Sequence, residues 1–61
     1  MCQIAFFDTD GTELHYWSYQ DILTASRVFD RLDAGYYEGP DGWQYAELWN
    51  RNRLQQTITN A

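Results

Sequence analysis

The chain has 61 residues, with nine acidic residues against four arginines and no lysine, so its formal net charge is −5. A chain of this length forms one small domain over residues 1–61, which excludes multidomain enzymes and cofactor-binding α/β folds. Affinity for phosphates comes mainly from clustered lysine and arginine, so direct binding to DNA or RNA is not expected either. Three tryptophans, five tyrosines and three phenylalanines argue against disorder.

Cys2 is the only cysteine, so an intrachain disulfide cannot form. A lone thiol is typical of a reducing compartment. The first residues carry no basic side chain and soon reach Asp8, unlike a signal peptide or a membrane span. We therefore expect a cytoplasmic protein.

A β-hairpin is predicted at the start of the chain. Residues 2–7 and 13–18 both alternate between apolar and other side chains, and they flank Asp10-Gly11. A two-residue turn there would place Asp8 opposite Glu13, and such a like-charge pair is unfavourable.

The alternative register uses a longer loop with Gly11 in the left-handed conformation. It pairs Phe6 with Leu14 and Ile4 with Tyr16, which collects apolar side chains on one face. We predict this second register.

A helix is predicted over residues 19–34. Ser18 and Asp21 form the Ser-x-x-acid pattern of a helix start, and Gly35 supplies the stop. The apolar side chains fall on one stripe, with Leu23 outside it, and these are Ile22, Ala25, Val28, Phe29 and Leu32.

The last third of the chain has two interpretations. Residues 43–49 fit either a strand or a helical turn opened by Asp41. We prefer a second hairpin that turns at residues 50–52 and pairs Leu48 with Leu54. The predicted fold is therefore α+β, with the order ββαββ and an antiparallel sheet that carries the helix on one face. The covered face would hold Ile4, Phe6, Leu14, Tyr16, Ala46, Leu48, Leu54 and Ile58.

These registers place aromatic side chains on the face of the sheet that the helix does not cover. Large exposed apolar patches usually mark interfaces. An aromatic sheet face can pack on a second copy or on a partner protein, and we assign this role to Phe7, Trp17, Trp43, Tyr45 and Trp49.

The segment 4–12 resembles the first motif of haloacid-dehalogenase-type phosphatases, an apolar strand followed by Asp-x-Asp-Gly-Thr. The resemblance implies that Asp8 is a nucleophile and Asp10 an acid/base, with magnesium nearby. That family also requires a lysine and a much longer parallel core, and this chain contains no lysine. With His15 as the only histidine, we expect no catalytic residue, no cofactor and no metal site.

The acids form two groups along the chain. Asp8, Asp10 and Glu13 lie at the first predicted turn, and four others surround the predicted helix exit, where carboxylates oppose the helix dipole. A sequence that keeps carboxylates at this unfavourable position can be using their negative charge for its function. The second group comprises Asp30, Asp33, Glu38 and Asp41.

Acidic side chains on a rigid scaffold can satisfy the lysines and arginines that would otherwise meet phosphates. In composition the chain resembles the small inhibitors that phages and plasmids use, such as anti-CRISPR, anti-restriction and DNA-mimic proteins. We therefore predict a non-enzymatic inhibitor that blocks a basic nucleic-acid-binding groove of a host complex. The alternative is a regulatory or assembly module that forms a homodimer through the aromatic face.

Overall fold

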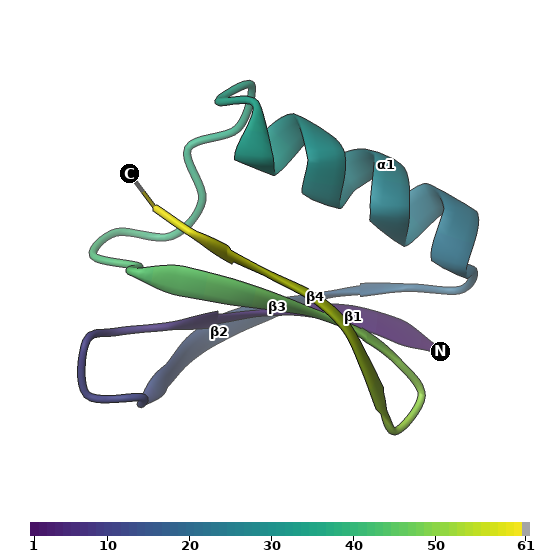
Figure 1. The fold of residues 1–61 in the computed structure, drawn as a ribbon, viewed down its shortest axis with the longest axis horizontal. Helices are drawn as coiled ribbons and strands as arrows, with labels where there is room; N and C mark the ends of the chain where they lie inside the picture. The colour runs from purple at the N-terminus through teal and green to yellow at the C-terminus, as the bar shows by residue number, and fades with distance from the viewer. Residues whose placement is uncertain (61) are drawn as a thin grey trace.

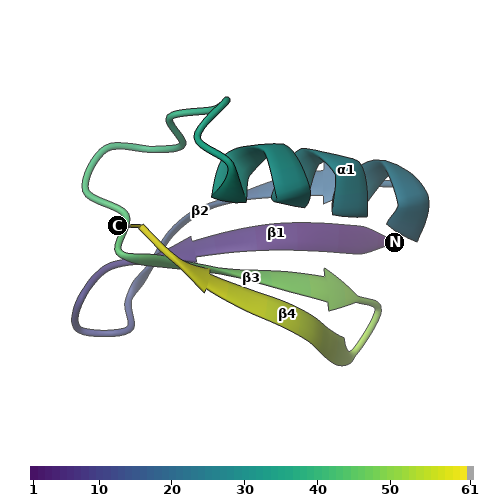
Figure 2. The same cartoon turned by 45° about the horizontal axis from the view of Figure 1, so that its top comes forward.

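The computed structural model describes residues 1–60. In chain order the elements are β1 (Cys2–Phe7), β2 (Glu13–Tyr19), α1 (Ile22–Asp33), β3 (Tyr45–Asn50) and β4 (Arg53–Thr59). The strands form one four-stranded antiparallel sheet in the order β2-β1-β3-β4. The helix lies across one face of this sheet (Figures 1 and 2). The predicted α+β fold with the order ββαββ is confirmed.

The turn of the first hairpin has the predicted form. Gly11 is left-handed, with φ of +83°. Its N–H donates to the Asp8 carbonyl at 3.1 Å, and the Asp8 N–H donates to the Thr12 carbonyl at 3.0 Å. A tight turn followed by a left-handed glycine therefore joins β1 to β2.

The predicted register of this hairpin is wrong beyond the turn. A β-bulge between Phe6 and Phe7 places Phe6 opposite His15 and leaves Leu14 as the extra residue of β2. The bulge shifts the alternation of β2 by one residue, so Trp17 turns towards the helix and packs edge-on against Phe6, with ring centroids 4.6 Å apart. Leu14 and Tyr16, expected under the helix, are 40% and 50% exposed.

The helix begins at Ile22 rather than at residue 19. Tyr19 still belongs to β2, where it pairs with Cys2, so the helix cannot start until the strand has ended. Asp21 is the N-cap instead of Ser18, and its Oδ1 accepts the N–H of Thr24 at 2.8 Å.

The C-terminal stop at Gly35 is confirmed. Gly35 has φ of +89°. Its N–H donates to the Leu32 carbonyl at 3.2 Å, and the N–H of Tyr36 donates to the Arg31 carbonyl at 2.9 Å. These two bonds are the Schellman pattern, which satisfies carbonyls at the end of the helix.

The second hairpin is also present, but its register differs from the prediction. Ala46 and Ile58 share one face as expected, and the structure pairs them directly with each other. A bulge in β4 then places Leu54 opposite Trp49, so Leu54 joins the uncovered face and is 48% exposed. The expected pair of Leu48 and Leu54 does not form, because one extra residue in a strand reverses which face the following side chains occupy.

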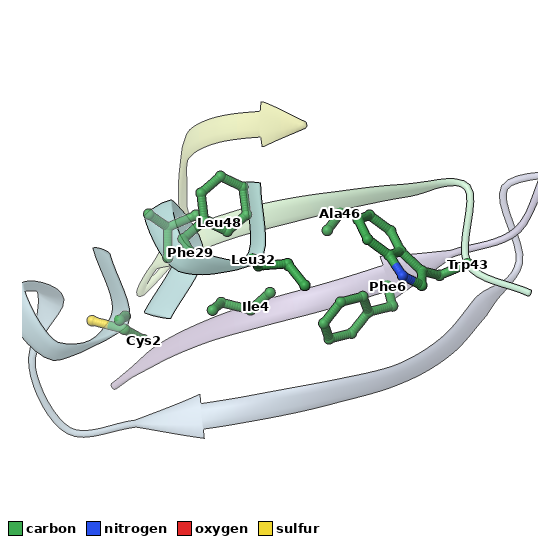
Figure 3. Packing of buried hydrophobic residues seen from close by; sticks show 9 residues of the cluster. Cys2, Ile4, Phe6, Phe29, Leu32, Trp43, Ala46 and Leu48 are labelled. Carbon is green, nitrogen blue, oxygen red and sulfur yellow. The ribbon is translucent and has the colours of Figure 1, made fainter. Parts of the chain in front are cut away.

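The core lies between the sheet and the helix (Figure 3). Alternate residues of β1 and β3 point towards the apolar stripe of α1, as predicted. Trp43, from the loop before β3, packs edge-on against Phe6 at 5.4 Å and is buried. The buried cluster consists of Cys2, Ile4, Phe6, Ala25, Phe29, Leu32, Trp43, Ala46 and Leu48.

Candidate partner-docking surface

The first group of acids is built around a rigid turn. The Asp8 carboxylate is tied into the loop, because its Oδ1 accepts the N–H of Asp10 at 2.9 Å and the N–H of Thr12 at 3.0 Å. Asp10 and Glu13 are exposed. Asp8 therefore shapes the turn that presents Asp10, rather than presenting a free carboxylate itself.

The second group of acids surrounds the end of the helix. Asp30 and Asp33 lie in its last turn and are exposed. Glu38 and Asp41 belong to the loop between α1 and β3, and both side chains are exposed. Asp33 and Glu38 also line one groove of about 450 Å³, whose floor is formed by Trp43 and by the end of β4.

The fold brings the two groups to the same end of the molecule. The β1–β2 turn and the loop before β3 lie at the left end of the sheet, and α1 runs towards that end but finishes above the sheet, on the side away from the turn (Figures 1 and 2). Seven of the nine acids belong to these segments, and Arg31 is the one arginine within them. We call this surface the acidic end, and it consists of Asp8, Asp10, Glu13, Asp30, Asp33, Glu38 and Asp41.

The opposite end has the reverse balance. The β3–β4 turn lies there together with the start of the helix (Figures 1 and 2). It carries Arg51, whose φ is +59°, and Arg53 at the first position of β4. The molecule is therefore electrically asymmetric along its strands. These arginines were not among the predicted site residues, although their spacing around the predicted turn was a usable signal.

The uncovered face of the sheet carries fewer aromatic rings than expected. Phe7 and Tyr45 stack there, with centroids 4.9 Å apart and planes 12° from parallel. Trp49 is half-buried, and its Nε1 donates to Oε1 of Glu47 at 3.0 Å.

Trp17 and Trp43 do not belong to this face. The bulge in β2 turns Trp17 towards the helix, and Trp43 lies in a loop that folds over the core. The expectation that these two rings are exposed on the open face is wrong, because both pack against Phe6.

An aromatic groove that the sequence analysis missed lies beside the edge strand β2. Tyr37 from the loop contacts Trp17 edge-on, with ring centroids 6.5 Å apart. The pKa of Tyr19 is raised, mainly because its side chain is partly buried and also because Tyr37 lies nearby. The alternation of Trp17 and Tyr19 was the available signal, but the predicted register assigned Trp17 to the uncovered face and Tyr19 was predicted to begin the helix. The lining residues are Tyr16, Trp17, Ser18, Tyr19, Val28 and Tyr37.

Residues 1–60 contain neither a metal-binding cluster nor a membrane-spanning helix. No group of three or more histidine, cysteine or carboxylate side chains within that range has the arrangement that would hold a metal ion. Nor does that part of the chain contain a helix with the length and apolar character needed to cross a membrane.

No family model, curated protein or solved structure matches this chain.

Proposed function

We propose that this protein is a non-catalytic binding domain that uses its acidic end to occupy a basic, nucleic-acid-binding groove on a partner protein. It would thereby inhibit the complex to which that partner belongs. The observation that supports this proposal is the convergence of two acid groups, far apart in the sequence, at one end of the sheet (Figure 1).

The geometry suits such a role for a physical reason. Carboxylates attached to a rigid turn and to a capped helix lose little conformational freedom when they bind, so less of the interaction energy is lost to ordering. The bonds from Asp10 and Thr12 to the Asp8 carboxylate fix the turn. Charge complementarity would also accelerate the encounter with a positive groove.

The alternative function from the sequence, dimerisation through an aromatic sheet face, has less support. Of its five rings, Phe7, Tyr45 and Trp49 lie on the open face. Glu47 lies among them, opposite Ala5 in the middle of the sheet. Burying an ionised carboxylate in an apolar interface is costly unless a partner charge meets it.

The test is capture of the partner from host lysate at low salt, followed by measurement of affinity with the purified partner. Binding should weaken steeply as ionic strength rises, and DNA or RNA should compete for the same groove. An affinity that is insensitive to salt and to nucleic acid would contradict the proposal.

A pair of matched variants locates the surface. Asp10→Asn with Asp41→Asn raises the net charge by two at the acidic end, where both side chains are exposed. Leu23→Lys with Asn52→Lys makes the same change at the other end, also at exposed positions. The two substitutions at the acidic end should weaken binding by about fivefold, because an exposed ion pair contributes up to ~1 kcal/mol. The two substitutions at the other end should have little effect. Equal effects would show that only the net charge matters.

A further inference from the structure

The edge strand β4 is the most exposed element of the fold. It pairs with β3 on one side, and within residues 1–60 no strand lies on its other side. The helix packs against β1, β2 and β3, and Figure 2 shows β4 extending beyond its cover. Ile58 is half-buried, whereas every other residue of β4 is exposed.

Residues 56–60, the second half of this edge, lack the features that usually protect an edge strand. Natural edges carry lysine, proline or inward-pointing charges, or they are very short. Residues 54–60 contain no charged residue, no proline and no glycine, and Thr57, Ile58 and Thr59 favour extended structure. The bulge at Gln55 interrupts the start of the strand and leaves residues 56–60 regular.

The hydrogen bonds to β3 show which backbone groups remain free. The Asn60 N–H donates to the Gln44 carbonyl at 2.8 Å, so the backbone groups of Asn60 face β3. Backbone groups alternate in direction along an antiparallel strand. Those of Ile58 therefore also face β3, and those of Thr57 and Thr59 point away from the sheet.

We propose that β4 pairs antiparallel with β4 of a second copy of this chain, with Ile58 on the two-fold axis. Thr57 of each copy then exchanges backbone hydrogen bonds with Thr59 of the other. Ile58 meets Ile58 on the helix side, so the half-buried apolar residue of the strand gains a partner. The two four-stranded sheets become one continuous sheet.

Charge favours a second copy over an unrelated strand. In the antiparallel arrangement the basic turn of one copy lies beside the acidic end of the other. Arg53 is five positions from Ile58, or ~17 Å along the strand, which carries it beyond Asn60 of the second copy. Asn60 lines the same groove as Asp33 and Glu38, so Arg53 extends towards the end of the second copy that carries these carboxylates.

This assembly does not rest on the proposed function, although it engages Asp33 and Glu38 of the acidic end, and either can fail without the other. The β1–β2 turn lies on the far side of the sheet from β4, because β2 is the opposite edge. The carboxylates of that turn would therefore stay free in the dimer. Binding to a basic partner and self-association can be measured separately on the same variants.

Sedimentation equilibrium of the purified chain gives the first test, and we expect a reversible dimer. Thr57→Pro removes an outward N–H that β3 does not use, so the fold should survive while the dimer dissociation constant rises at least about tenfold. Thr57→Val keeps the backbone donor and is the matched control, which should dimerise like the parent. Circular dichroism checks that both variants are folded.

Two further variants test the register and the charges. The Ile58 residues of the two copies would form a non-hydrogen-bonded pair, with Cα atoms ~4.5 Å apart. Ile58→Cys should therefore form a disulfide-linked dimer on mild oxidation. Gln55→Cys is the control and should not. Arg53→Glu should weaken the dimer, and adding Glu38→Arg should restore it.

The proposal is overturned if the parent chain stays monomeric at millimolar concentration, or if Thr57→Pro dimerises as tightly as Thr57→Val. A dimer that survives Thr57→Pro and is lost in Trp49→Lys would lie on the open face of the sheet. That result would also reject the β4 interface.

Discussion

The indole of Trp43 packs directly against the backbone of Gly39. A Cβ at position 39 would lie 2.6 Å from Nε1 of Trp43, and Gly39 has φ of +73°. The same Nε1 donates to the Glu38 carbonyl at 2.8 Å. The loop that carries part of the acidic end is therefore fixed to the core through one tryptophan, and that attachment requires glycine at position 39.

Gly39→Ala is expected to destabilise the protein more than Gly42→Ala. Both positions have a left-handed φ, which costs alanine ~1–2 kcal/mol, but a Cβ at position 42 meets no atom within 4 Å. The clash with Trp43 should add ~1–3 kcal/mol in Gly39→Ala. Urea unfolding of the two variants measures the difference, and equal midpoints would show that the indole moves aside freely.

Trp43→Phe is expected to lower the melting temperature by roughly 10 °C, because it loses the hydrogen bond to Glu38 and leaves unfilled volume beside Phe6, together worth ~2 kcal/mol. Trp49→Phe is the control. Trp49 lies on the open face, and its Nε1 bonds to the Glu47 side chain. Its replacement should change the melting temperature much less. Similar shifts for the two variants would contradict the assignment of Trp43 to the core.

Asp21 should contribute a pH-dependent part of the stability. Hydrogen bonds from the backbone and side chain of Thr24 lower the pKa of Asp21 below its usual value of 3.8. A folded-state pKa below the unfolded one gives stability that is present above pH 3.8 and lost as pH falls through the folded value. Asp21→Ala should therefore be destabilising at pH 7, and its difference from the parent should shrink in acid.

Asp21→Asn separates charge from capping. Asparagine caps a helix about as well as aspartate but does not titrate. The stability of Asp21→Asn relative to the parent should therefore improve as the parent carboxyl becomes protonated. Urea unfolding from pH 7 to pH 3 measures this change. A constant difference across this range would rule out the shifted carboxyl as the cause.

The Cys2 thiol should be protected in the folded protein. Its side chain is 2% exposed, and Sγ donates to Oδ1 of Asn50 at 3.4 Å. A thiol-specific reagent should label it at least ~100-fold more slowly in buffer than in denaturant, because labelling requires opening of the sheet beside α1. Rapid labelling without denaturant would show that the start of β1 frays.

The order of elements could be predicted because it depends on local signals. The alternation in residues 2–7, the apolar stripe around Phe29 and the glycine at position 35 each act within a few residues. The two bulges could not be predicted in this way. The one at Leu14 places Trp17 instead of Tyr16 on the side of Phe6, and this choice depends on contacts that exist only in the assembled core.

The candidate site shows the same division. The two groups of acids were visible in the sequence, but their meeting at one end depends on the direction of the helix relative to β1. Trp43 was assigned to the open face because it alternates with Tyr45 and Trp49 in the predicted strand, whereas β3 begins only at Tyr45. Its burial follows from the path of residues 34–44 over the end of the sheet.

The strand order also sets limits on how the chain folds during synthesis. β1 is an inner strand that lies between β2 and β3. Its hydrogen bonds to β3 can form only after the chain has been synthesised as far as Asn50, which pairs with Cys2. The first hairpin and the helix can form locally while the chain emerges, but they leave one side of β1 unpaired and Phe6 without its indole cover. Residues up to Asn50 must therefore have left the ribosome before the two inner strands of this sheet can pair along their full length.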